Sequence, residues 1–135
     1  MIRRQSNIGS YDAAAVVSGI PDLIPYLNNA SPFTRMMLAA EYGDPDRDFR
    51  ALQQLSPVTF LERVTGPVQL IHGVNDFAVP VSQAIELYEY LRHHTSGSEL
   101  ILFRDEGRSL HRKESWVQSV GHRIRFFRKQ MLGLD

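Results

Sequence analysis

Three short apolar runs, each too brief for a helix, punctuate this chain. They cover Ala13–Val17, residues 68–71 and residues 100–103. Glycine, proline or polar residues flank each run, which is typical of strands buried in a parallel sheet. The pattern therefore predicts three strands covered by other layers on both faces.

The segments between the strands show helical spacing, with apolar residues three and four positions apart. We predict short helices over about 22–27, 34–41 and 46–55, and a longer helix from about residue 80 to 95. The clearest helix runs from about Glu114 to Leu132. Its apolar stripe, which we expect to lie on the sheet, is made of Val117, Val120, Ile124, Phe127 and Met131.

A strand, a crossover helix and a second strand of this length form a right-handed parallel unit. The predicted fold class is therefore α/β, with three layers and a short parallel sheet of about three strands between flanking helices. We expect residues 1–10 to be a flexible lead and residues 11–135 to form one domain.

Composition limits the classes of protein that fit. The 135 residues are 43% hydrophobic and 22% charged, which excludes a mostly disordered chain. The formal net charge is +0, and cysteine is absent, so disulfides and thiolate chemistry are excluded. Since we find no apolar run of about 18 residues and no signal peptide, we expect a cytoplasmic protein that binds no membrane.

Asp76 is the first candidate site residue. It follows the central strand, which Gly73 ends, so its side chain is expected at the carboxyl edge of the sheet. Functional sites of open α/β sheets lie at this edge. A plain Asn-Asp turn is the alternative interpretation of the same residues.

Two motifs carry a resemblance to a known family: His72-Gly73-x-Asn75-Asp76-x-x-Val79-Pro80-Val81 and Phe103-x-Asp105-Glu106-Gly107. In this order, with a helix and a strand between them, they resemble the C-terminal half of the catalytic domain of the prolyl oligopeptidase family. The resemblance covers about residues 11–132 and implies part of an α/β-hydrolase fold. It places Asp76 at the acid of the family's catalytic triad and Arg108 where the family has the triad histidine.

The chain departs from the chemistry of that family in two places. No serine stands in a Gly-x-Ser-x-Gly motif, the turn that exposes the nucleophile, and the resemblance places that motif before Ala13. An arginine keeps its proton, so Arg108 cannot act as the base. We predict instead that Arg108 forms an ion pair with Asp76, within hydrogen-bond distance, because a buried carboxylate without a partner is costly.

Histidine offers one weak substitute for the missing base. His111 lies three residues beyond Arg108, although a solvated loop histidine explains it more simply. We interpret His72 as a core residue with a satisfied ring nitrogen. No histidine pair at i and i+4 accompanies a carboxylate, so we expect neither a metal nor another cofactor.

The predicted function is a non-catalytic interaction or binding module, inactive alone, with a peptide or an acyl compound as a possible ligand. One alternative is a serine peptidase or acyl hydrolase that becomes active when a partner chain supplies the nucleophile. A second alternative is nucleic-acid binding through the basic last helix. A solvated helix face explains those cations more simply, so we do not expect a nucleic-acid partner.

Assembly is predicted from the first strand. Ala13–Val17 would be an edge strand without the lysines or prolines that protect such edges. The polar lead offers little apolar area to cover it. We therefore expect a homodimer about a two-fold axis, or a partner chain, to cover this edge.

Overall fold

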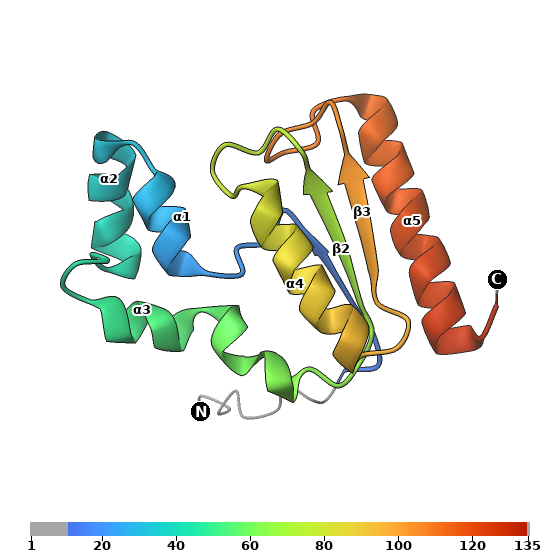
Figure 1. Ribbon diagram of the computed structural model, residues 1–135. Coiled ribbons are helices and arrows are strands. Elements are labelled where there is room, and N and C mark those ends of the chain that lie inside the picture. Colours follow the sequence, from blue (N-terminus) through green and yellow to red (C-terminus); the bar gives the residue numbers. More distant parts are fainter. Residues whose placement is uncertain (1–10, 135) are drawn as a thin grey trace, which may run out of the picture.

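The computed structural model describes residues 11–134, and the predicted lead at residues 1–10 lies outside the described part. Its centre is a parallel sheet of three strands in the order β1-β2-β3 (Figure 1). The strands are β1 (Ala14–Val17), β2 (Val68–Gly73) and β3 (Glu99–Phe103). The predicted α/β class and the three parallel strands are confirmed.

The central strand β2 is buried along its whole length because a helix covers each face of the sheet (Figure 1). On one face lies α4 (Val81–His94), whose Leu91 packs with Val68 and Leu70. Burying one leucine side chain contributes about 1.5–3 kcal/mol. Leu87 and Tyr88 of α4 pack against the same cluster.

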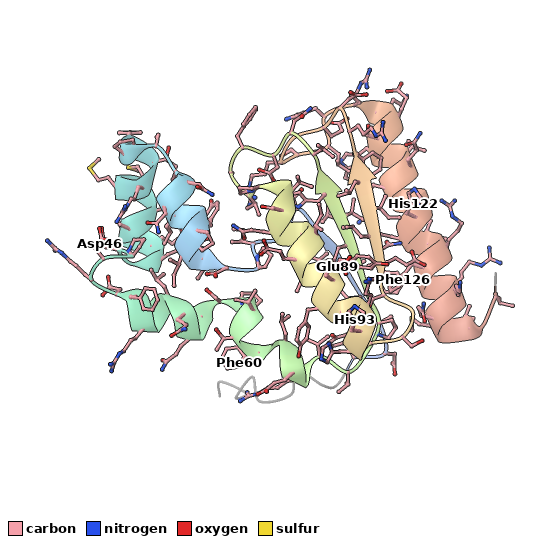
Figure 2. The ribbon with its side chains drawn as sticks, viewed as in Figure 1. Asp46, Phe60, Glu89, His93, His122 and Phe126 are labelled. Carbon is pink, nitrogen blue, oxygen red and sulfur yellow. The ribbon has the colours of Figure 1, made fainter. Side chains whose placement is uncertain are left out.

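The opposite face is covered by α5 (Lys113–Leu132), and the prediction that its apolar stripe lies on the sheet is wrong. Ser115, Ser119 and Phe126 are the buried residues, whereas Ile124 and Met131 are 54% and 58% exposed. Phe126 and His122 lie on the side of α5 that faces the sheet (Figure 2). The helix therefore turns a largely polar row inward.

A buried amide of the sheet contacts the backbone of α5. Side chains alternate between the faces of a strand, and Gln69 of β2 points toward α5. Its amide nitrogen donates to the His122 carbonyl at 3.2 Å and to a Glu99 carboxylate oxygen at 3.0 Å. The Gln69 amide nitrogen thus links β2 to β3 and to the backbone of α5, whereas its Oε1 and the Ser119 hydroxyl have no hydrogen-bond partner among the described residues.

Three short helices form a second, smaller core beside the sheet (Figure 1). They are α1 (Leu23–Asn29), α2 (Pro32–Tyr42) and α3 (Phe49–Leu55), and the 3-10 helix η1 (Pro57–Arg63) follows them.

Leu23, Leu27 and Leu52 make up the buried part of this smaller core. The helix predicted from residue 46 begins only at Phe49, because a turn over residues 44–48 precedes it. Phe49, Leu52 and Leu55 stand three positions apart, but only Leu52 is buried, because Phe49 and Leu55 are half or more exposed. No helix in the described part is long and apolar enough to cross a membrane.

Candidate functional site

Two loops meet at the carboxyl edge of the sheet, one after β2 and one after β3. The amide of Val74 donates to the Phe103 carbonyl, and the amide of Asn75 donates to the Glu106 carbonyl, both at 2.9 Å. A Cβ on Gly73 would lie 2.1 Å from the Gly107 carbonyl oxygen. Only glycine permits this approach, so Gly73 fixes how closely the two loops lie.

Asp76 is held in this corner with its side chain fully buried. Its Oδ1 accepts hydrogen bonds from the amides of Ala78 and Val79, each at 2.9 Å. Its Oδ2 lies 3.5 Å from Nε2 of His72 and 3.6 Å from Nη1 of Arg108. One oxygen thus shapes the turn, and the other faces two nitrogen groups.

The structure brings Arg108 to Asp76 as an ion pair, although 3.6 Å is longer than the hydrogen bond that the sequence predicted. The Arg108 guanidinium also lies over the Tyr26 ring, 5.5 Å from its centre, and its side chain is 37% exposed. A guanidinium is only a donor. Of the two nitrogen groups that face this carboxylate, the one at the position where the resemblance places the base is therefore a permanent cation.

Neither His111, the weak substitute for the base, nor the core residue His72 is placed to act as a base. His72 is buried, and its Nε2 lies 2.9 Å from the Val79 carbonyl oxygen, to which it donates. His111 lies in the exposed loop before α5, and its backbone amide donates to Glu106. Within residues 11–134, no group of three or more His, Cys, Asp or Glu side chains is placed to hold a metal ion.

Ser18 is a residue of this corner that the sequence did not reveal. It follows β1 with a φ of +50°, a left-handed conformation that is uncommon for serine. Its hydroxyl donates to the Arg108 carbonyl, which ties β1 to the loop after β3. Ser18-Gly19 reads only as the end of a strand, so no sequence signal identifies this contact.

Glu106 belongs to the second sequence motif, but the sequence did not reveal that it anchors the start of α5. Its buried carboxylate accepts hydrogen bonds from the amides of His111 and Arg112 at 2.9 Å and 3.1 Å. The Ser115 hydroxyl, followed by these two amides, holds the pKa of Glu106 below its ordinary value. Arg112 cannot cap the helix with its own side chain, so Glu106 does this from the preceding loop.

We expect the Glu106→Gln variant to be less stable than the wild type at pH 7 and to lose less stability in acid. A carboxyl whose pKa is lowered by folding stabilises the protein above its unfolded pKa, about 4.3, and this contribution disappears as the pH falls through the folded value. Urea unfolding at pH 7, 5 and 3.5 measures the difference. Asp105→Asn is the control, because the Asp105 side chain is 80% exposed. Equal acid dependence of the wild type and Glu106→Gln would contradict this role.

The basic residues of α5 make different contacts. Arg123 donates from Nε to the Ser119 carbonyl and lies over the Trp116 ring, whereas Arg125 lies beside His122. Nucleic-acid binding by this helix stays an alternative prediction, and salt-dependent retention of DNA or RNA would test it.

Comparison with known sequences finds the same family that the two sequence motifs resemble. The sequence model of the prolyl oligopeptidase family matches residues 6–133. A Caenorhabditis elegans protein named dipeptidyl peptidase family member 6 is 28% identical over 126 residues. That match covers 93% of this chain but 16% of the worm protein.

Solved structures of two peptidases have the same arrangement. A puromycin-hydrolyzing peptidase of Mycobacterium tuberculosis superposes with a TM-score of 0.80 at 24% identity, over 91% of this chain and 20% of that one. An acylaminoacyl peptidase of Pyrococcus horikoshii gives 0.77 at 17% identity, over 92% and 21%. The fold is therefore part of an α/β-hydrolase, and the chain spans about a fifth of these relatives.

Proposed function

Because the chain belongs to the prolyl oligopeptidase family, we propose that it acts as a non-catalytic binding module, which keeps the acid corner of that family's active site without its chemistry. The observation that carries this proposal is the ion pair between Asp76 and Arg108, with Nη1 3.6 Å from Oδ2. In a working triad, this carboxylate orients an imidazole that accepts the proton of the nucleophile. A guanidinium in that place leaves no acceptor for the proton.

The other polar groups of the corner are engaged in structural contacts. The Ser18 hydroxyl donates to a carbonyl, and Nε2 of His72 does the same. A serine becomes a nucleophile only when a base accepts its proton. These contacts support a corner that holds loops together rather than one that breaks bonds.

The open edge of β1 is the surface that we propose for binding. Among residues 11–134, β1 pairs only with β2, in the strand order β1-β2-β3, and Val16 and Val17 are 37% and 39% exposed. An extended segment can add to such an edge through main-chain hydrogen bonds. We propose that a strand of a second copy or of a partner chain, or a bound peptide, adds to β1.

The rival function is a hydrolase whose nucleophile and base come from a partner chain. The position of Asp76 favours it, because the carboxylate is already buried and oriented at the carboxyl edge of the sheet. A partner strand that added to β1 in the parallel direction would end at this same carboxyl edge of the sheet. Activity that appears only in a complex, and disappears in Asp76→Asn, would support the rival.

Steady-state hydrolysis tests the proposal. We expect the purified chain to cleave neither an acyl-peptide p-nitroanilide nor p-nitrophenyl acetate faster than the buffer, and Asp76→Asn to change nothing. Arg108→Lys is the matched control, because it preserves a cation in place of the base. Turnover that survives purification and disappears in Ser18→Ala, or in any other single serine variant, would contradict a non-catalytic role.

A further inference from the structure

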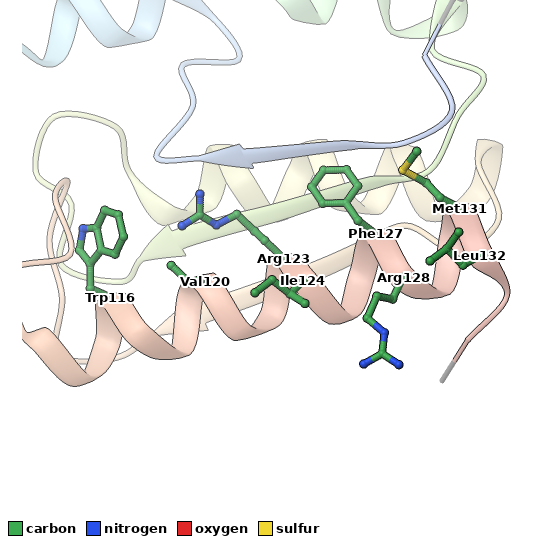
Figure 3. Close-up of a pocket in the computed structure, with 8 residues that line it drawn as sticks. All are labelled: Trp116, Val120, Arg123, Ile124, Phe127, Arg128, Met131 and Leu132. Atoms are coloured by element: carbon green, nitrogen blue, oxygen red, sulfur yellow. The ribbon is translucent and has the colours of Figure 1, made fainter.

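A groove of about 630 Å³ runs along α5, and Figure 3 shows Trp116, Arg123 and Phe127 pointing toward the side on which β1 lies. Two rows of residues bound it, and within each row the residues stand four positions apart. In helix packing, a ridge of another helix fits into the groove between two such rows. The first row is Trp116, Val120, Ile124, Arg128 and Leu132, and the second is Arg123, Phe127 and Met131. The lining is apolar except for two arginines, and it includes no carboxylate.

The exposed side of α2 is a ridge of matching form. Phe33, Met36 and Met37 are 70%, 62% and 59% exposed, and no residue of α2 is fully buried. Phe33, Met37 and the exposed Glu41 stand four apart and so form one row. Met37 in this row and Met36 beside it are flexible side chains that adapt to irregular apolar surfaces.

We propose that the α5 groove of one copy of this chain binds the α2 ridge of a second copy, with Glu41 beside Arg128. The helix α2 is about 16 Å long, and the groove between residues 116 and 132 is about 24 Å long, so the ridge fits within it. Inserting one four-spaced row between two others is the commonest packing of helices in globular proteins. The carboxylate of Glu41 supplies the negative charge that is absent from the groove lining.

The contact has to form between two copies. Figure 1 places α2 and α5 at opposite ends of the molecule, with the sheet and α4 between them. Pairing α5 with another α5 would bring Arg123 and Arg128 of both copies together without a carboxylate. The α2 ridge avoids this repulsion, which favours a contact between two different surfaces over a symmetric α5 pair.

This association is separate from the proposed function, because it uses neither the Asp76 corner nor the β1 edge. Its test uses two variants on exposed positions, Met37→Glu in the ridge and Ile124→Glu in the groove. Each should weaken self-association in sedimentation velocity by about 30-fold or more, as expected for a central contact residue. Circular dichroism checks that both variants keep the fold.

Mixing the two variants gives the decisive measurement. The groove of the Met37→Glu protein and the ridge of the Ile124→Glu protein are both intact, so an equimolar mixture should form a 1:1 complex although neither variant associates alone. The charge exchange Glu41→Arg with Arg128→Glu should restore association that either single change weakens.

Each protein in this series is also measured with the additional substitution Val16→Lys, which blocks the addition of a strand at β1. The 1:1 complex should persist in that background. A wild-type chain that is monomeric at 100 μM, or a mixture of the two variants that stays monomeric, would overturn the proposal. So would self-association that Val16→Lys abolishes and Met37→Glu leaves unchanged.

Discussion

Replacing Gly73 by alanine should destabilise the protein by at least about 3 kcal/mol, more than most single substitutions. The added Cβ would lie 2.1 Å from the Gly107 carbonyl oxygen and 2.5 Å from that of Glu106. Both are backbone atoms, so no side-chain rotation relieves the contact. The loop after β3 has to move, which separates Arg108 from Asp76.

Gly107→Ala is the matched control for this substitution. Its Cβ would meet the Asn75 carbonyl oxygen at 3.4 Å, which is an ordinary contact. Chemical denaturation of the two variants should therefore give a large loss for Gly73→Ala and about 1 kcal/mol or less for Gly107→Ala. Equal losses would show that the two loops do not meet as described.

Asp76→Ala should cost about 3 kcal/mol. The substitution leaves the amides of Ala78 and Val79 without their acceptor, and each unsatisfied buried donor costs roughly 1–3 kcal/mol. It also removes the anionic partner of Arg108. Urea unfolding monitored by the fluorescence of Trp116 measures the loss.

Arg108→Ala is the matched variant on the other side of the ion pair. Because its side chain is 37% exposed, solvent screens the pair, and we expect a loss of about 1 kcal/mol. The difference between the two variants therefore reports the hydrogen bonds of the turn. If Arg108→Ala cost as much as Asp76→Ala, the ion pair rather than the turn would dominate this corner.

The sequence predicted the strands well because burial on both faces leaves a clear signal of short apolar runs. It predicted the position of α5 but not its orientation. Periodicity identifies an apolar face, whereas the face that meets the sheet makes contacts with distant strands, such as His122 with the Phe103 ring and the His122 carbonyl with Gln69. No local pattern records such contacts.

The candidate site likewise contains residues that the sequence predicted and residues that it did not. Asp76 and Arg108 were predictable because each follows a strand in a recognisable motif, and adjacent parallel strands bring such positions to one edge. Ser18 and Glu106 were missed because their roles depend on long-range hydrogen bonds, from Ser18 to Arg108 and from the start of α5 to Glu106. Such contacts appear only when the chain is folded.

Covalent labelling tests the central claim, the loss of chemistry at the acid corner, most directly. The folded chain is incubated with a serine-directed fluorophosphonate, and the intact mass is measured over time, with Arg108→His and the urea-unfolded chain measured in parallel. The account predicts that the folded wild type keeps its unmodified mass and labels no faster than the unfolded chain. A single adduct that forms faster in the folded wild type, and maps to one serine whose replacement abolishes it, would contradict the account.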